Sequence, residues 1–404
     1  MPASQGSVVA AAVRASLERS SWIRRMFEEG ARLKAEHGAE HVYDFSLGNP
    51  ILEPPPQVRE ALQGLLASPA PGLHRYIPNP GLPEVRAYVA AELAREMGLP
   101  YAANHVVLTC GAAGAVNIVL KALLNPGDEV VTFSPYFVEY DFYAANHGGK
   151  LVRAETDADF QIDLEALDRV VTGRTRALLI NSPNNPTGVI YPEDKLRALA
   201  DYLNDAARRF GRPIFLLADE PYRKLVFDGN TVPWLPPLYD HTIIVTSYSK
   251  DLGLAGERIG FAAVHPRAAE AGLLLDAMVL ANRVLGFVNA PALIQRVLPL
   301  VRGAMVDVGY YQRMRDRMLA PLREMGYECV TPGGAFYLFP KSPVPDDVAF
   351  VRTAQAQRLL LVPGSGFGRA GYFRISLAVT EDVIDRSLPV FAQVLQQVRG
   401  QALI

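Results

Sequence analysis

The chain has 404 residues, of which 50% are apolar, and a formal net charge of -2 at pH 7. This length exceeds the size at which a single hydrophobic core stops growing, so we expect two domains. Because the charged residues are mixed in sign, the sequence offers no basic field for nucleic acid and no acidic tail. It favours a small molecule as the partner.

The rarer residue types give no sign of disulfides, metals or membrane spans. The two cysteines, Cys110 and Cys329, are too few for a disulfide framework and are not spaced as a metal site, which fits a reducing cytoplasm. The seven histidines form no HExxH or comparable ligand pattern, so no metal is predicted. No stretch of about 18 apolar residues occurs, and the N-terminus lacks a cationic region followed by an apolar run. We therefore expect a soluble and unprocessed protein.

The N-terminal segment, to about Asn49, contains one amphipathic helix over residues 20–37, then a strand and turn over residues 42–49. Beyond it, short apolar runs alternate with helical patterns. The runs span residues 105–109, 129–134, 151–155, 176–182, 214–219, 242–247 and 260–265. Runs this apolar are typical of strands buried on both faces of a mostly parallel sheet, and the alternation predicts an α/β core with helices on both faces.

The pattern changes in the C-terminal part of the chain. It indicates a long helix over about residues 290–325, short strands over 337–339 and 372–377, and a closing helix from about Glu381. This order predicts a smaller α+β domain. No internal repeat or flexible linker interrupts the chain.

Polar and small residues follow the strands at the edge where open α/β sheets bind ligands. After the first strand, Gly111-Ala112-Ala113-Gly114 opens a helix and offers backbone N–H groups to an anion, although a simple tight turn has the same composition. After the second, Phe137 offers a face for a planar ring or belongs to the core. After the fourth, the loop from Asn181 to Gly188 presents Asn185 or serves only as a turn. After the fifth, Asp219 and Tyr222 supply a carboxylate and a phenol, or cap the turn.

Lys250 follows the sixth strand, between small hydroxyl residues in Ser247-Tyr248-Ser249-Lys250. Partial burial and a neighbouring cation such as Arg258 lower the pKa of an amine, as Schiff-base chemistry requires. An isolated lysine is more often a solvated surface residue. Here, however, a lysine, a carboxylate, a phenol, an amide, an aromatic face and an anion cradle share one sheet edge. That set suits a cofactor with an aldehyde, a pyridine nitrogen, a phenolic oxygen and a phosphate, which describes pyridoxal phosphate.

These motifs resemble those of the class I/II aminotransferases, which are pyridoxal-phosphate enzymes of fold type I. The likeness runs from Ser46-Leu47-Gly48-Asn49-Pro50 to Arg374-Ile375-Ser376-Leu377 and so covers nearly the whole chain. The resemblance implies a large cofactor-binding domain with a mostly parallel seven-stranded sheet over residues 50–295. It also implies a small α+β domain over residues 296–404, with residues 1–49 packing against it.

The resemblance also implies the roles of individual residues. Lys250 would form the Schiff base and act as general base, and Asp219 would pair with the pyridinium nitrogen. Tyr222 and Asn185 would hydrogen-bond the phenolic oxygen. Arg374 would take the substrate α-carboxylate as a bidentate pair, with Gly48 and Asn185 beside it. The implied cofactor contacts are Gly111, Ala112, Ala113, Phe137, Asn185, Asp219, Tyr222, Ser247, Ser249, Lys250, Arg258 and, from a partner subunit, Tyr76. We therefore expect a homodimer.

The implied reaction moves an amino group between an L-amino acid and a 2-oxo acid through a Schiff base on Lys250. Two groups in the family bind acidic substrates, one through a partner's arginine where this chain has Val284 beside Arg283, the other through a lysine where it has Ala113. Their absence favours a neutral donor, although Arg283 could compensate. Glutamate or 2-oxoglutarate is expected as the second partner on family grounds only.

Two other activities use the same scaffold. A C–S lyase or related elimination enzyme shares every cofactor contact, and the motifs do not separate it from a transaminase. A ligand-sensing part of a transcription regulator would need an attached DNA-binding domain, and the residues before Gly48 show one helix and no helix-turn-helix pair.

Overall fold

The computed structural model describes residues 8–18, 22–67 and 71–401. Its largest element is a seven-stranded sheet with the order β2-β8-β7-β6-β5-β3-β4. The strands are β2 (Val106–Thr109), β3 (Glu129–Ser134), β4 (Lys150–Glu155), β5 (Thr175–Asn181), β6 (Phe215–Asp219), β7 (Thr242–Ser247) and β8 (Gly260–Val264). Strand β8 pairs antiparallel with both β2 and β7, and all other neighbouring strands of this sheet pair in parallel. The predicted mostly parallel α/β sheet is therefore confirmed, with strand ends within one residue of those expected.

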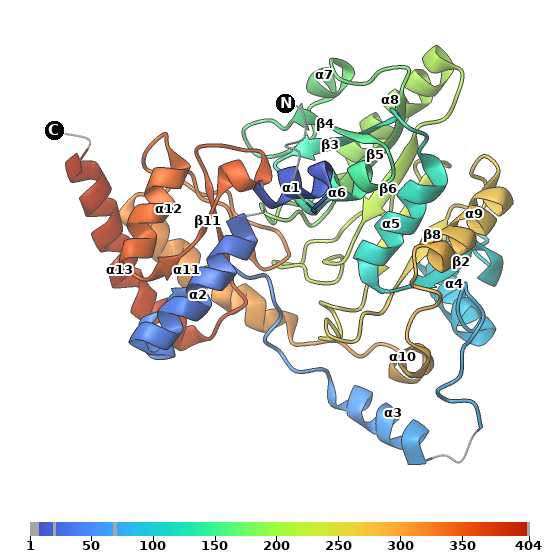
Figure 1. The fold of residues 1–404 in the computed structure, drawn as a ribbon, viewed down its shortest axis with the longest axis horizontal. Coiled ribbons are helices and arrows are strands. Elements are labelled where there is room, and N and C mark those ends of the chain that lie inside the picture. The colour runs from blue at the N-terminus through green and yellow to red at the C-terminus, as the bar shows by residue number, and fades with distance from the viewer. Residues whose placement is uncertain (1–7, 19–21, 68–70, 402–404) are drawn as a thin grey trace.

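Helices cover both faces of this sheet (Figure 1). Alternate strand residues point to opposite faces, which is the period of an extended chain. One face packs on α5 (Gly111–Leu123), α6 (Glu139–Asn146) and α9 (Ala271–Val284). The other packs on α7 (Leu164–Asp168) and α8 (Glu193–Phe210), and towards β2 on α3 (Pro56–Ala67), α4 (Pro83–Met97) and α10 (Ala292–Val297). The edge strand β4 is the exception to two-sided burial, since most of its residues are partly or fully exposed.

The C-terminal part of the chain forms a second core beside the sheet (Figure 1). It contains the antiparallel strands β9 (Tyr337–Leu338), β11 (Val362–Pro363) and β12 (Phe373–Ser376). Its helices are α11 (Val308–Met325), α12 (Asp347–Ala356) and α13 (Glu381–Gln401). Short 3-10 helices also occur along the whole chain, namely η1 (Ala39–His41), η2 (Ala103–His105), η3 (Leu298–Val301) and η4 (Gly364–Phe367).

The N-terminal segment joins this second core. Strand β1 (Tyr43–Asp44) pairs in parallel with β10 (Leu359–Leu360), and α2 (Trp22–His37) contributes Met26 and Leu33 to the core. A further short helix, α1 (Ala11–Glu18), precedes α2, so the expectation of a single helix in this segment was incomplete. We propose on this basis the division into residues 1–49, 50–295 and 296–404.

The predicted continuous helix over residues 290–325 is wrong. The chain forms α10 and η3, then an irregular stretch, and α11 begins only at Val308. Pro299 lies in η3 and lacks the N–H that a continuing helix needs, and Gly303 has a φ of 77°, which lies outside the helical region. The apolar periodicity continues through this break because Leu298 and Val301 still face a core, with α3 and α4.

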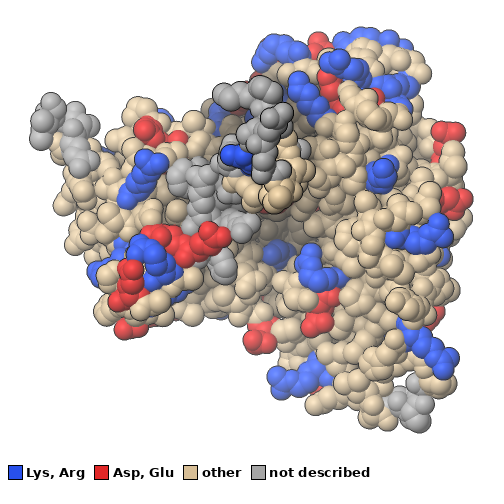
Figure 2. Space-filling model, viewed as in Figure 1, with Lys and Arg blue, Asp and Glu red and all other residues tan. Residues whose placement is uncertain are grey.

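The surface carries charges of both signs. On the face in Figure 2, basic and acidic side chains are interspersed among other residues. Across the described part of the chain, no helix is both long and apolar enough to cross a bilayer.

Candidate active site

The residues predicted for the site, except Gly111 and Tyr76, line one cavity of about 260 Å³ at the carboxyl ends of the central strands. Strand β6 ends at Asp219, strand β7 ends at Ser247, and α5 begins at Gly111, so three chain turns open onto the same space. Strand β12 brings Arg374 from the C-terminal core. The predicted residues that line the cavity are Gly48, Ala112, Ala113, Phe137, Asn185, Asp219, Tyr222, Ser247, Ser249, Lys250, Arg258 and Arg374.

Lys250 is the amine of this cavity. Its Nζ donates a hydrogen bond to the Gly48 carbonyl at 3.0 Å and has no carboxylate partner in the described chain. Burial, with the positive charges of Arg258 and Arg374, lowers the pKa of Lys250 to about 8. At neutral pH an appreciable fraction of this amine is therefore unprotonated, which is the form that attacks a carbonyl or removes a proton.

Asp219 is the carboxylate of the cavity and is only 6% exposed. Its Oδ2 accepts a hydrogen bond from the Tyr140 hydroxyl, and its Oδ1 has no partner. Burial raises the pKa of Asp219 to about 7, against the hydrogen bond from Tyr140, which lowers it. A buried carboxylate oxygen without a partner is costly, so this atom is suited to a ligand that brings a proton or a positive charge.

A group of amides and phenols fixes the space between these two residues. The Asn181 amide donates to the Asp219 carbonyl at 2.7 Å, and the Asn185 backbone N–H donates to Asn181 Oδ1 at 2.7 Å. The Tyr222 hydroxyl lies 2.9 Å from that of Tyr337. Burial raises the pKa of both phenols, so each is a neutral hydroxyl that can donate to a ligand oxygen.

The opening turn of α5 and Arg258 are suited to bind an anion. Gly111 has a φ of +73°, and a Cβ at this position would lie 2.9 Å from Nη2 of Arg258, so only glycine allows this close approach. Arg258 itself has a φ of 51° and donates to the Ala255 carbonyl at 3.0 Å. Backbone N–H groups at a helix start, a guanidinium and the hydroxyls of Ser247 and Ser249 suit a phosphate.

Arg374 lies at the opposite side and is 2% exposed. It donates to Asn185 Oδ1 at 3.0 Å and to the Ser46 carbonyl at 2.7 Å, while its Nε has no partner. The rings of Tyr337 and Phe367 flank the guanidinium, with centroids 4.6 and 4.7 Å from it. Burial lowers the pKa of Arg374, and no carboxylate of the described chain pairs with it. This buried cation is suited to an anionic ligand.

One expected contact is not made within a single chain, and some residues that line the cavity were not expected from the sequence. Tyr76 is 90% exposed and does not line the cavity, so its contact with a partner's site stays a prediction. Tyr140, Tyr143 and Tyr337 also line the cavity, although no sequence motif singled them out. Tyr140 lies three residues after Phe137, one helical turn away, and this spacing could have identified it. The position of Tyr337 depends on the pairing of β9 with β12, for which the sequence carries no local signal.

The geometry fits pyridoxal phosphate. The unpartnered Oδ1 of Asp219 suits a protonated ring nitrogen, Tyr222 and Asn185 suit the ring oxygen, and the α5 turn suits the phosphate. Lys250 lines the same cavity and suits the aldehyde. The fold and this arrangement together define the class of enzyme as a fold-type I pyridoxal-phosphate enzyme.

The comparison with protein families gives the narrower assignment. The model for "Aminotransferase class I and II" matches residues 40–390, so the chain belongs to this family. The family depends on pyridoxal phosphate, and the chain is an aminotransferase, as its resemblance predicted.

Named relatives agree with this assignment. The chain is 35% identical to a probable aspartate/prephenate aminotransferase from Thermus aquaticus, over 86% of this chain and 90% of that protein. It is 29% identical to an aspartate aminotransferase from Geobacillus stearothermophilus, over 89% and 92%. A C–S lyase is not favoured, because these relatives are aminotransferases.

Solved structures show the same fold. An aminotransferase from Eubacterium rectale superposes with a TM-score of 0.93 at 38% identity, covering 97% of this chain and 99% of the other. Aspartate aminotransferase from Thermus thermophilus with maleate gives a TM-score of 0.84 at 29% identity, covering 96% and 100%.

Proposed function

We propose that this aminotransferase takes its amino group from an L-amino acid with a neutral side chain and passes it to a 2-oxo acid, with pyridoxal phosphate held on Lys250. The observation that carries the proposal is that Arg374, a buried cation without a carboxylate partner in the described part of the chain, shares one cavity with Lys250 and Asp219. An α-carboxylate would supply the missing counter-charge as a bidentate pair.

Pyridoxal phosphate, when bound, would supply a carbonyl group that reacts with an amine and a ring that withdraws electrons from the bound substrate. The protein residues supply position and protons. Lys250 has its pKa lowered to about 8, so it can hold or accept a proton near neutral pH and act as the general base at the substrate Cα. Asp219 would stabilise positive charge on the cofactor ring, since its Oδ1 is a hydrogen-bond acceptor without a partner among the described residues. Tyr140 keeps this carboxylate oriented through its hydrogen bond to the other oxygen.

The two ends of the cavity fix the direction of the substrate. Arg258 and the α5 turn hold the anionic end of the cofactor, while Arg374 holds the substrate carboxylate from the other side. Tyr222 and Asn185 line the same cavity. A substrate held in this way would have its Cα near Lys250, which is the condition for an efficient proton transfer.

The proposal of a neutral donor depends on the absence of a further cation. Among the described residues that line the cavity, the basic ones are Lys250, Arg258 and Arg374, and each has a role already. Ala113 occupies its wall, and Arg283 is exposed on α9 and does not line it. An acidic donor is the second candidate, because several relatives are named for aspartate.

We also propose that the enzyme works as a cytoplasmic homodimer. Tyr76 is an exposed tyrosine in a segment rich in proline and glycine, and it would complete the phosphate end of a partner's cavity. A large exposed aromatic side chain is typical of an interface residue.

A spectroscopic titration tests the proposed function. The cofactor-loaded protein is mixed with single amino acids, without an acceptor, and the visible band of the lysine-bound cofactor is followed. We expect neutral amino acids to convert this band to the amino form of the cofactor, and a 2-oxo acid to restore it. Conversion by aspartate and glutamate alone would contradict the neutral donor. The absence of a lysine-bound band would contradict the role of Lys250.

A further inference from the structure

A second cavity lies behind the candidate active site. This rear cavity has a volume of about 510 Å³, which is within the range of small-molecule sites. Its walls come from α4, η3, the loop at residues 303–305 and the ends of β6 and β7. Pro221 and Ser247 line both cavities, so only the two strand ends separate them.

Two buried carboxylates line the rear cavity, and each follows a key residue of the active site. Glu220 comes after Asp219, and Asp251 comes after Lys250. In each pair the first residue lines the active site and the second lines the rear cavity. Glu220 is 3% exposed and Asp251 is 5% exposed. The proposed mechanism uses neither of them.

Each carboxylate is only half satisfied. Arg223 binds Oε1 of Glu220 at 3.1 Å, and Lys224 binds Oδ2 of Asp251 at 3.0 Å. The other oxygens, Oε2 of Glu220 and Oδ1 of Asp251, have no partner. A buried carboxylate oxygen without a partner carries an uncompensated desolvation cost, which a bound hydrogen-bond donor would remove.

The basic residues of the rear cavity are already engaged. The guanidinium carbon of Arg223 lies 3.2 Å from the centroid of the Trp234 ring. Arg223 also donates hydrogen bonds to backbone carbonyls of the loop that contains Trp234. Arg95 pairs with Glu92 at 3.0 Å. The buried polar atoms without a partner are therefore acceptors, and an anionic ligand would find two carboxylates and no unpaired buried cation.

The rest of the wall is apolar and aromatic. It includes Val89, Leu93, Leu252, Leu298 and Val301, with the rings of Tyr88, Tyr248 and Phe261. This combination suits a ligand with an apolar body and one donating, positively charged end. Burial raises the pKa of Glu220, which is the electrostatic cost that such a cation would offset.

We propose that the rear cavity is a second binding site for a small organic cation of the amine, amidine or guanidine class with an apolar body. Its cationic end lies between Glu220 and Asp251, and its body lies against the apolar wall. This inference goes beyond the proposed transamination and does not depend on the identity of the amino donor.

Benzamidine is a suitable probe, because it is a flat aromatic cation with two donating nitrogens and is protonated at neutral pH, so it does not react with the cofactor as an amine substrate does. Calorimetric titration of the cofactor-loaded protein should show one saturable site per chain. Benzyl alcohol, which has the same ring without the charge, should bind at least about tenfold more weakly. The absence of saturable benzamidine binding would overturn the proposal.

Variants locate the site. Glu220→Gln and Asp251→Asn should each weaken benzamidine binding by about tenfold or more, while Glu193→Gln, which removes an exposed carboxylate of α8, should leave it unchanged. Ala304→Trp places a large side chain in the rear cavity and leaves both carboxylates unsubstituted, and it should abolish binding. Because it is independent of the carboxylates, this variant decides the question if either of the first two fails to fold. Binding that survives Ala304→Trp, or that is equal in all variants, would place benzamidine elsewhere and overturn the assignment.

Discussion

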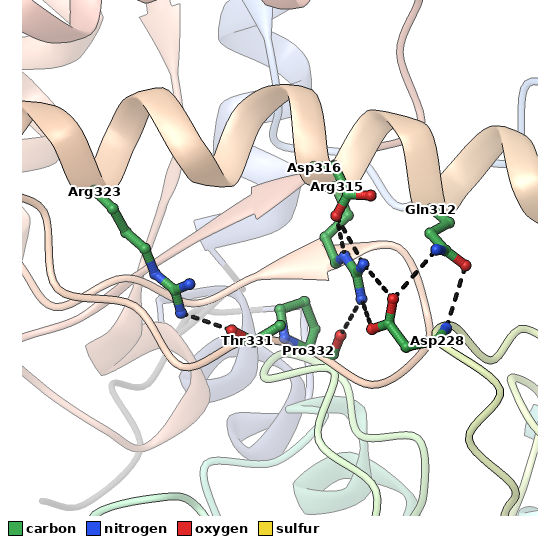
Figure 3. A network of polar contacts seen from close by, with 7 residues as sticks. All are labelled: Asp228, Gln312, Arg315, Asp316, Arg323, Thr331 and Pro332. Carbon is green, nitrogen blue, oxygen red and sulfur yellow. Dashed lines mark hydrogen bonds and ion pairs between the residues drawn. The ribbon is translucent and has the colours of Figure 1, made fainter.

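Two buried arginines of this chain have opposite surroundings. Arg315 on α11 is 4% exposed, and it binds Asp228 through both Nη atoms, Asp316 through Nη2, and the Pro332 carbonyl (Figure 3). These carboxylates raise the pKa of Arg315, with the hydrogen bond to Asp228 as the largest cause. Arg374 is 2% exposed and contacts only neutral acceptors, and burial lowers its pKa.

This difference distinguishes an arginine that stabilises the fold from an arginine that is suited to bind a ligand. The chain satisfies Arg315 by itself, and its network joins α11 to the loop after β6, which also receives a hydrogen bond from Gln312 (Figure 3). Arg374 keeps an uncompensated charge among the described residues, and we propose that a substrate carboxylate completes the pair. Lys250 belongs with Arg374, since its amine also donates to a neutral carbonyl and pairs with no carboxylate of the described residues.

The largest expected effect is that of Lys250→Ala. If Lys250 is the binding lysine and not a structural one, this variant should lose transamination by more than about 10⁴-fold and lose the lysine-bound visible band, with little change in melting temperature. Lys341→Ala, at a lysine that is 54% exposed, is the matched control and should keep both. Near-native turnover in Lys250→Ala would contradict the assignment.

Asp219→Asn should follow with a loss of about 10²-fold or more in turnover, because the amide cannot stabilise positive charge on the ring nitrogen. Cofactor binding should be partly retained, since the phosphate end is unchanged. Steady-state rates and the visible spectrum measure the two effects separately. Asp240→Asn, at a 46% exposed position, serves as control. Equal rates in Asp219→Asn and the parent would remove the electrostatic role of Asp219.

The unpaired surroundings of Lys250 also predict a pH dependence. An amine whose pKa is lowered to about 8 is unprotonated above that pH, so capture of pyridoxal phosphate by the apo-protein should rise about tenfold per pH unit below 8 and level off above it. Because the charge of Arg374 contributes to this lowering, Arg374→Met should shift the midpoint upwards. A rate that still rises above pH 10, as for an ordinary lysine, would contradict the lowered pKa.

The smallest effect concerns stability. Arg315→Met should lower the free energy of unfolding by about 1–3 kcal/mol, because it removes charge-assisted hydrogen bonds that the chain itself satisfies. Activity should change little. Urea unfolding measures the free energy of unfolding of Arg315→Met and of Arg374→Met and so tests the comparison. We expect the smaller loss of stability in Arg374→Met, because this substitution removes a charge that has no partner. An equal loss in the two variants would show that the two arginines do not differ as described.

Much of the fold could be predicted because apolar runs such as residues 129–134 are buried on both faces and differ sharply from their flanks. The cofactor side of the site could also be predicted, since its residues directly follow strands whose carboxyl ends share one edge. The break at Pro299 was missed because apolar periodicity continues through it. Tyr337 was missed because its position depends on a long-range strand pairing.

The unpaired state of Arg374 and the rear cavity were also beyond the sequence. Both features depend on which side chains do not contact one another in the folded chain. A sequence pattern shows only which residues are near one another along the chain. The carboxylates Glu220 and Asp251 stand beside predicted site residues, yet they point into a different space. The order of the sequence therefore identified this region of the fold but did not distinguish the active-site cavity from the rear cavity.

The most direct measurement compares Arg374→Met with the parent enzyme on two donors, an amino acid and the amine that lacks its carboxylate. If the unpaired Arg374 receives the α-carboxylate, kcat/KM for the amino acid should fall by about 10²- to 10³-fold, which corresponds to about 3–4 kcal/mol, while kcat/KM for the amine stays the same. An equal fall for both donors would mean that Arg374 only supports the structure, as Arg315 does. No fall for either would mean that the substrate carboxylate binds elsewhere.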